Sequence, residues 1–176
     1  METCYIWMKS PVGKLLLVAD EEGLIEVAFA EGRTVPVVDP SWIDVSETCG
    51  GALLREPVRQ LEAFFGGELR DFDLPLKPRG TAFQQRVWKL LCEIPFGETI
   101  SYGELARRAG NPAASRAVGL ANGSNPIAIV VPCHRVIGSN GKLTGYGGGL
   151  DNKRWLIDFE RNRLFGQHLV YELNGH

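Results

Sequence analysis

The most informative stretch of this chain is Ile127-Ala128-Ile129-Val130-Val131-Pro132-Cys133-His134-Arg135. Its five leading apolar residues are typical of a buried strand, and Pro132 ends sheet pairing because it has no N–H. A thiol at the end of this strand has an imidazole and a guanidinium as neighbours. Such groups lower the pKa of a thiol toward neutrality, and the thiolate is the nucleophile. The alternative is a cysteine that only fills the core, since free cysteine is among the most buried residue types.

Length and composition place the chain among ordinary globular proteins. Its 176 residues, 44% hydrophobic and 23% charged, are enough for one domain or two small ones. The first residues lack the basic segment and apolar run of a secretory signal, and no apolar run is long enough to span a bilayer. The four cysteines are scattered without a Cys-x-x-Cys pair, which suits a reducing cytoplasm. No short-spaced ligand pair accompanies His134, so we predict no metal.

The charges of the chain are divided unevenly along its length. Residues 1–78 carry 7 Lys and Arg against 14 Asp and Glu, a balance of −7. Residues 79–176 carry 12 against 7, a balance of +5. This asymmetry indicates that the second half meets a polyanion. The alternative is a chance distribution of solvated surface charge.

The first half has the pattern of a small sheet followed by a helix. Strands are predicted over Cys4–Met8, Lys14–Ala19 and Leu24–Ala30, with turns between them. Apolar residues then recur at helical spacing, at Leu54, Val58, Leu61 and Phe65, before Gly66-Gly67 ends the helix. Pro57 is expected in the first turn of this helix, where its missing N–H costs little. Residues 72–80, rich in proline, are predicted to be a linker.

The second half has the pattern of several short helices. Thr81-x-x-Gln84 and Ser101-x-x-Glu104 are capping boxes that predict two helix starts. The apolar face of the first helix is predicted to be Phe83, Val87, Leu90, Leu91 and Ile94. The second helix ends at Gly110, and Ala113–Ala121 follows as another, so the pair is typical of a helix-turn-helix. Its basic residues are Arg107, Arg108 and Arg116.

From Arg79 to Leu156 the chain resembles the catalytic domain of the O6-alkylguanine-DNA alkyltransferases, which repair alkylated guanine. The residues that carry the resemblance are Gly80-Thr81-x-Phe83-Gln84-x-x-Val87-Trp88, Ile94-Pro95-x-Gly97-x-Thr99-x-Ser101-Tyr102-Gly103, Ser115-Arg116-Ala117-Val118-Gly119, Asn125-Pro126, Pro132-Cys133-His134-Arg135-Val136 and Gly145-Tyr146-Gly147-Gly148-Gly149. The resemblance implies an α+β fold. We expect a small N-terminal sheet-and-helix domain over residues 1–78, a mainly helical catalytic domain over 79–165, and a C-terminal tail over 166–176.

The same resemblance implies the residues of the active site. Cys133 would accept the alkyl group from guanine O6, His134 would act as its water-mediated base, and Glu160 would orient the imidazole. Asn125 would support the turn near the thiol. For Glu160 the alternative is a solvated charge on a helix, and for Asn125 it is ordinary Asn-Pro turn chemistry.

Contacts with DNA follow from the resemblance too. Arg116 would insert where the target nucleotide is flipped out of the duplex, from a helix-turn-helix bound in the minor groove. The other DNA-binding residues implied are Tyr102, Ser115, Ala117 and Gly119. Tyr102 is implied as a catalytic residue as well, since it would crowd the target phosphate and donate to the guanine ring. The small residues of this helix would allow close approach to the groove, although tight helix packing would explain them equally. The alkylated base would lie against Val136, Tyr146 and Gly147. Gly147 replaces a serine of some relatives, so a hydroxyl contact to O6 would be absent and extra room would be left for larger alkyl groups.

These inferences predict a single-turnover DNA repair enzyme. Attack on an sp³ alkyl carbon leaves a thioether on Cys133, which water does not cleave under mild conditions, so transfer is irreversible and stoichiometric. The expected substrates are O6-alkylguanine and O4-alkylthymine in double-stranded DNA, with no cofactor, no membrane and no obligate protein partner for a cytoplasmic monomer. A cysteine hydrolase or amidase would use the same three residues but leaves the basic helices unexplained. A DNA-binding sensor without catalysis would leave Cys133 unused.

Overall fold

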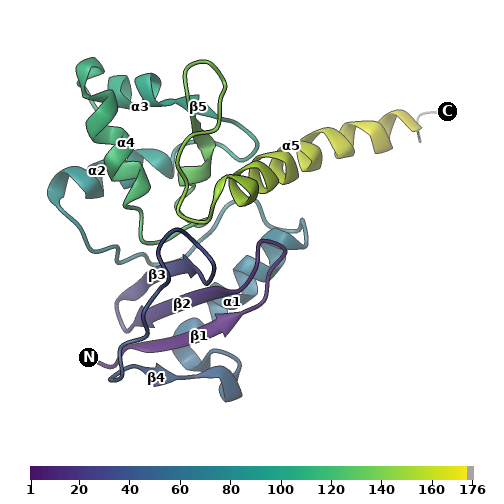
Figure 1. Cartoon of the computed structure of the whole chain (residues 1–176). Coiled ribbons are helices and arrows are strands. Elements are labelled where there is room, and N and C mark those ends of the chain that lie inside the picture. The colour runs from purple at the N-terminus through teal and green to yellow at the C-terminus, as the bar shows by residue number, and fades with distance from the viewer. Residues whose placement is uncertain (174–176) are drawn as a thin grey trace.

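The N-terminal part of the molecule is a four-stranded sheet with a helix on one face (Figure 1). The computed structural model describes the backbone of residues 1–173 and the side chains of residues 1–164. The strands are β1 (Cys4–Met8), β2 (Leu15–Asp20), β3 (Gly23–Phe29) and β4 (Ile43–Asp44), in the order β3-β2-β1-β4. The first three pair antiparallel, and β4 pairs parallel with β1. The predicted three-stranded meander is confirmed.

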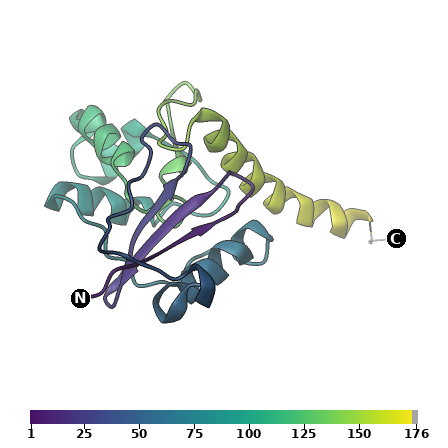
Figure 2. The ribbon, with the colours of Figure 1, turned by 60° about the horizontal axis from the view of Figure 1, so that its bottom comes forward.

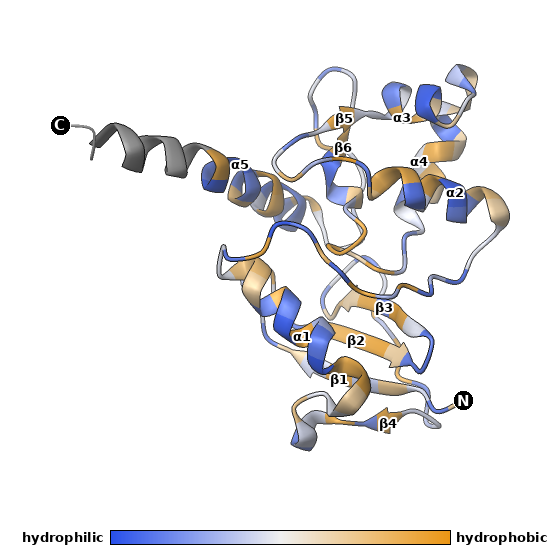
Figure 3. Cartoon of the chain, turned by 180° about the vertical axis from the view of Figure 1, so that it is seen from behind, coloured by the Kyte–Doolittle hydropathy of each residue, from blue (hydrophilic) through white to orange (hydrophobic). Residues whose placement is uncertain are grey.

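Both faces of this sheet are covered, so all six residues of β2 are buried. Helix α1 (Gly51–Phe65) packs on one face, as Figure 2 shows. On the other face a smaller apolar cluster is formed by Leu16, Val18 and Ile25, with Tyr5, Trp7, Val38 and Trp42 against it. The strands are accordingly the most continuously apolar part of the N-terminal half, whereas α1 alternates apolar and polar segments (Figure 3).

Helix α1 begins earlier than its apolar spacing indicates. Gly50 is the N-cap residue, with a φ of 94°, and Pro57 lies in the second helical turn rather than the first. The prediction for Pro57 was therefore wrong, because a glycine cap provides no side-chain signal for the start of a helix. The predicted end is confirmed, since the helix stops at Phe65 and Gly66 caps it.

The C-terminal part consists of short helices, two short strands and one long helix. Its elements are α2 (Ala82–Leu91), β5 (Ile100–Ser101), α3 (Tyr102–Arg108), α4 (Ser115–Gly123), β6 (Val136–Ile137) and α5 (Leu150–Leu173). Three 3₁₀ turns complete the chain, at Ser46–Thr48, Pro112–Ala114 and Cys133–Arg135. Thr81 forms both hydrogen bonds of the predicted capping box with Gln84. Phe83 is 41% exposed, however, and Trp88 is buried on the inward face of α2 in its place.

The apolar run before Cys133 is not a strand, which corrects the prediction. Only Ile127 forms an isolated parallel bridge, with Val27 of β3, and residues 128–130 form a turn. Ile129 has a φ of 71°, which is unusual for a β-branched residue and takes the chain out of an extended path. All five residues are nevertheless buried. The run is apolar because it passes through the core, and burial alone does not distinguish a strand from a buried turn.

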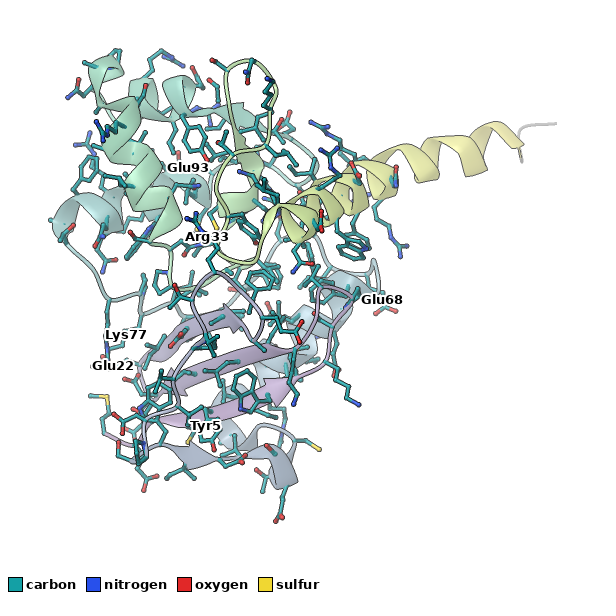
Figure 4. The ribbon with its side chains drawn as sticks, viewed as in Figure 1. Tyr5, Glu22, Arg33, Glu68, Lys77 and Glu93 are labelled. Carbon is teal, nitrogen blue, oxygen red and sulfur yellow. The ribbon has the colours of Figure 1, made fainter. Side chains whose placement is uncertain are left out.

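The sheet and the helical part share one continuous core. Strand β3 donates from Val27 N to Pro126 O at 2.9 Å and accepts from Ala128 N at 3.1 Å. Along the same strand Leu24 bonds Pro75 O and Lys77 N, each at 2.8 Å, so the predicted linker is held against the sheet. The Lys77 ammonium lies beside Glu22 and 2.7 Å from Asp20 (Figure 4). The domain boundary at 78/79 stays a prediction.

Helix α5 leaves the body of the molecule and extends toward the C-terminus (Figure 1). It continues from residue 150 to residue 173, so its backbone has no break at the boundary predicted between 165 and 166. The last residues of the predicted tail, 174–176, lie outside the described residues. Within the part of the chain that the structure describes, no helix combines the length and the apolar character needed to cross a bilayer.

Candidate active site

Cys133 begins the 3₁₀ turn Cys133–Arg135 and is only 6% exposed. The turn is held by Asn125, which donates through Nδ2 to Val131 O at 2.8 Å and Ile127 O at 3.3 Å. Its Oδ1 accepts from Ile127 N at 3.0 Å. Asn125 thus closes the buried loop that presents the thiol. The same contacts fit ordinary Asn-Pro turn chemistry and the supporting role expected of Asn125.

His134, Arg135 and Glu160 form a buried cluster behind the thiol. His134 is fully buried, and its Nε2 lies 2.6 Å from Glu160 Oε1. Arg135 donates to the same carboxylate through Nε and Nη2, at 2.9 Å each, and through Nη1 to Ile94 O at 2.6 Å. Glu160 also accepts from Gly97 N at 3.1 Å. Since Glu160 is 1% exposed, the alternative of a solvated helix charge is wrong.

The protonation state of this cluster follows from its contacts. Burial opposes ionisation of Glu160, but the hydrogen bonds from His134 and Arg135 hold its pKa at about 2. Burial lowers the pKa of His134 although Glu160 acts in the opposite direction, so the imidazole is neutral at pH 7. A carboxylate only accepts hydrogen bonds, so the proton of the neutral ring is assigned to Nε2. Nδ1 is left as an unprotonated acceptor, and it has no partner among the described residues.

The pKa of the Cys133 thiol differs from the expectation of a lowered value. Burial raises the pKa of Cys133, while the Asn125 amide, the Lys153 ammonium and the N–H groups of residues 133 and 134 act in the opposite direction. The thiol is therefore protonated at rest and not a ready-made thiolate, because desolvation penalises the charged form more than these groups stabilise it. A base must remove the proton during the reaction.

Lys153 is a functional candidate that the sequence prediction missed. Its side chain is fully buried on α5, donates to Thr144 O at 2.9 Å and lies 5.8 Å from the centre of the Tyr102 ring. Burial lowers the pKa of Lys153 to about 8, although Cys133 acts in the opposite direction. The spacing of Lys153, Leu156, Ile157 and Glu160 marks one helix face. Lys153 and Glu160 are two charged residues on an otherwise apolar helix face, and this pattern is the sequence signal that could have identified Lys153.

The predicted helix-turn-helix is formed by α3 and α4. Ser101 caps α3 by accepting from Glu104 N at 3.0 Å, but the Glu104 carboxylate does not complete the capping box. It pairs instead with Arg107 at 2.6 Å and Arg108 at 3.1 Å. Two of the three predicted basic residues are therefore paired within the helix. Arg116 is exposed and has no hydrogen-bond or ion-pair partner among the residues whose side chains are described.

The small residues of α4 are divided between the two explanations offered for them. Ala117 is exposed, which leaves room for close approach of a groove, whereas Ala121 is buried and packs in the core. Gly119 faces the Tyr102 ring, because a Cβ built there would lie 3.7 Å from it. The hydroxyl of Tyr102 donates to Thr144 O at 3.4 Å.

Two adjoining hollows connect this helix to the thiol. A hollow of about 800 Å³ is lined by Tyr102, Ser115, Arg116, Gly119 and Tyr146, among others. A second hollow, of about 220 Å³, reaches Cys133 and shares Asn122, Gly123, Gly145, Tyr146 and Gly147 with the first. A Cβ added at Gly147 would meet no atom within 4 Å, which agrees with extra room at this position. Val136 is buried in β6 and lines neither hollow.

The N-terminal part contributes to these hollows, which the sequence did not indicate. Arg33 donates from its backbone N to Gly147 O at 2.7 Å and lies at the junction between the sheet and the helical part (Figure 4). Phe29 of β3 packs edge-on against Tyr146, with ring centres 5.5 Å apart. Within the described residues, no group of three His, Cys, Asp or Glu side chains is arranged to hold a metal ion.

Comparison with known proteins identifies the family. The chain matches models of the 6-O-methylguanine DNA methyltransferase ribonuclease-like domain over residues 3–78 and of its DNA binding domain over residues 82–162. It is 56% identical to the methylated-DNA–protein-cysteine methyltransferase of Methanosarcina acetivorans over 89% of this chain and 97% of that protein. It is 52% identical to the protein of the same name from Mycobacterium tuberculosis, over 90% and 93% of the two chains.

The solved structures agree with this result. The crystal structure of Mycobacterium tuberculosis O6-methylguanine methyltransferase matches with a TM-score of 0.80 and 49% identity, over 92% of this chain and 94% of that one. Mycobacterium tuberculosis OGT in complex with DNA matches with a TM-score of 0.81 and 50% identity, over 90% and 93%. The α+β fold and the resemblance read from the sequence are confirmed. The chain belongs to the 6-O-methylguanine DNA methyltransferase family, the methylated-DNA–protein-cysteine methyltransferases.

Proposed function

We propose that this protein repairs DNA by transferring the alkyl group of O6-alkylguanine to Cys133. The observation that carries the proposal is the buried thiol beside the His134–Glu160 pair, at the end of a hollow that continues to Arg116 on α4. The relatives support it, since they are named as methylated-DNA–protein-cysteine methyltransferases and one is solved in complex with DNA. O4-alkylthymine is a second expected substrate, because its alkyl carbon is also attached to an exocyclic oxygen.

The proton of the thiol leaves through His134. Nδ1 is the free acceptor of the neutral imidazole and has no direct hydrogen bond to the thiol, so a bridging water carries the proton between them. The resulting imidazolium is stabilised by Glu160, 2.6 Å from Nε2. The Lys153 ammonium, which acts on Cys133 electrostatically, stabilises the thiolate as it forms. Asn125 keeps the loop that carries the thiol in place.

The thiolate then attacks the alkyl carbon in a displacement. The Sγ–C bond forms as the C–O6 bond breaks, and the electron pair stays on the guanine, which recovers a proton from the site. The product on the protein is a thioether, which water does not cleave under mild conditions. Each chain therefore acts once and needs no cofactor, because the alkyl group comes from the DNA itself.

A buried thiol requires that the base come to it. Cys133 is 6% exposed, so a stacked and paired guanine cannot reach it without leaving the duplex. We propose that α4 lies in the minor groove of the DNA. Ala117 and Gly119 permit close approach to the groove, and Ser115 contacts the DNA backbone. Arg116, which is exposed and has no partner among the described side chains, fills the gap. Tyr102 crowds the target phosphate and donates to the guanine ring. Tyr146 and Gly147, which line both hollows, receive the flipped base.

The same chain provides the groups proposed to bind DNA, hold the base and react. We therefore propose a monomer without an obligate protein partner. All four cysteines are free thiols, which agrees with a cytoplasmic site of action.

Transfer of a radioactive label tests the proposed reaction directly. The protein is incubated with duplex DNA that contains O6-[³H-methyl]guanine, and the label is followed in protein, DNA and solvent. We expect the label on the protein, at no more than one methyl group per chain. Label released to solvent would identify a hydrolase, label that stays in the DNA would identify a binding protein, and sustained turnover would contradict the thioether product.

Arg116→Ala tests nucleotide extrusion. Repair of duplex DNA is expected to slow by about 10²-fold, since a few kcal/mol are needed to extrude a stacked base. Reaction with free O6-benzylguanine, which needs no extrusion, is expected to stay close to wild type. Arg107→Ala is the matched control, because this guanidinium is already paired with Glu104. Equal losses on duplex and free base would contradict the role given to Arg116.

A further inference from the structure

Three buried side-chain polar atoms have no hydrogen-bond partner among the described residues. They are Asn122 Oδ1, His134 Nδ1 and Tyr146 OH. All three belong to the surroundings of Cys133, since Asn122 and Tyr146 line the hollow that reaches the thiol and His134 follows it in the sequence. The free His134 nitrogen is explained by its role as a base. The Asn122 carbonyl oxygen is not explained by anything in the fold.

Asn122 is held firmly next to the nucleophile. It lies on α4, is 3% exposed and donates from Nδ2 to Cys133 O at 3.3 Å. This bond fixes the orientation of the amide, so Oδ1 is directed away from the Cys133 carbonyl. Asn122 also lines both hollows, the one that reaches the thiol and the one beside Arg116. Asn122 therefore lies where the hollow beside α4 adjoins the hollow that reaches Cys133.

Leaving such an acceptor unpaired destabilises the folded protein. A buried polar atom that lacks a partner loses the hydrogen bonds it would make to water, and the great majority of such atoms are therefore paired. Asn122 lines both hollows, so a ligand bound there is one source of the missing partner. The Asn122 oxygen can only accept a hydrogen bond, so a ligand that pairs with it must offer a donor at this point.

Alkylated guanine offers one kind of donor. When O6 carries an alkyl group, N1 has no hydrogen, and N1, N3, N7 and O6 are all acceptors. The exocyclic 2-amino group is then the hydrogen-bond donor of the base. We propose that Asn122 Oδ1 accepts a hydrogen bond from this 2-amino group and that Asn122 thereby selects guanine among O6-alkylated purines. This inference rests on the proposed function, whose substrate it specifies further.

The test compares two bases that differ only in the amino group. Transfer rates are measured on oligonucleotides with O6-methylguanine or O6-methylhypoxanthine, for wild type and for Asn122→Leu. Wild type is expected to react faster with O6-methylguanine than with O6-methylhypoxanthine. In the variant the ratio of these two rates is expected to be about 10-fold smaller, which is the effect of one buried hydrogen bond. The ratio of the two rates is then compared between wild type and the variant. Differences between the oligonucleotides cancel in this comparison, because both proteins are measured on the same two oligonucleotides.

A purely structural role gives a different result. If Asn122 only holds the Cys133 carbonyl, the variant slows on both bases equally, the ratio is unchanged and the proposal is overturned. Asn122→Ala, which removes the same oxygen with a smaller change in packing, is expected to reduce the ratio in the same way if the leucine does not fold.

Gln60→Leu is the matched control, since it removes a buried amide from α1, away from both hollows. It should leave the ratio at the wild-type value. Wild type without transfer from O6-methylguanine would refute the proposed function, whereas transfer with an unchanged ratio in Asn122→Leu refutes only the role of Asn122.

Discussion

Cys133→Ser is expected to abolish alkyl transfer while leaving DNA binding close to wild type. The serine hydroxyl has nearly the same size and fits the same buried position, but it is far less acidic and less nucleophilic than a thiol. His134 cannot remove its proton to a useful extent. The loss should exceed that of any other single substitution, because no other group in the site can form the bond to the alkyl carbon.

The measurement is transfer of labelled methyl from DNA, together with binding of the same DNA. Cys92→Ser is the matched control, since Cys92 is an exposed free thiol on the helical part. It should transfer at the wild-type rate. Peptide mapping that places the methyl group on Cys4, Cys49 or Cys92 would overturn the assignment of the nucleophile.

Glu160→Gln should affect both stability and reactivity. The carboxylate balances the buried Arg135 guanidinium and holds the His134 ring, so removing its charge leaves Arg135 uncompensated. Breaking a buried ion pair on one side destabilises a protein by about 3–5 kcal/mol. The pKa supports a similar figure, since a drop from 4.5 to about 2 corresponds to about 3 kcal/mol at ~1.36 kcal/mol per pH unit.

The sign of the pH dependence follows from the lowered pKa. The stability that Glu160 provides is fully present above pH 4.5 and is lost as the pH falls from 4.5 to about 2. His134 acts in the same direction at higher pH, because burial lowers its pKa and the unfolded chain binds the extra proton below about 6.5. Urea unfolding at pH 7 and pH 3 should show that Glu160→Gln loses most at pH 7 and has a flatter acid branch.

Reactivity should change through the thiol. Without the carboxylate the imidazolium is less stable, so the apparent pKa of Cys133 should rise and transfer at pH 7 should slow, with partial recovery at higher pH. Thiolate absorbance and a pH–rate profile measure both effects. Asp158→Asn, an exposed carboxylate on the same helix, is the matched control and should change neither. A Glu160→Gln protein with wild-type stability and profile would show that the buried cluster is not needed for either.

The sequence predicted those helices and strands correctly whose formation depends on local interactions. The strands of the meander, the Thr81 capping box and the glycines that end α1 all depend on residues that are neighbours along the chain. Elements whose signal was ambiguous were misread. The buried run before Cys133 is a turn, and Pro57 lies one turn deeper than expected, because apolar spacing reports burial and not the path of the backbone.

The candidate site shows the same division. The motif around Cys133 determined the nucleophile and its neighbouring imidazole by itself, since both lie within two residues. Tertiary structure alone decided which groups surround them: Glu160 and Ile94 are 26 and 41 residues away from their partners His134 and Arg135. Lys153 and Asn122 are candidates because the packing of α5 and α4 buries them near the thiol, which their positions in the sequence do not indicate. A periodic sequence specifies which face of a helix is buried, but the partner of that face is chosen by packing, where distant segments meet.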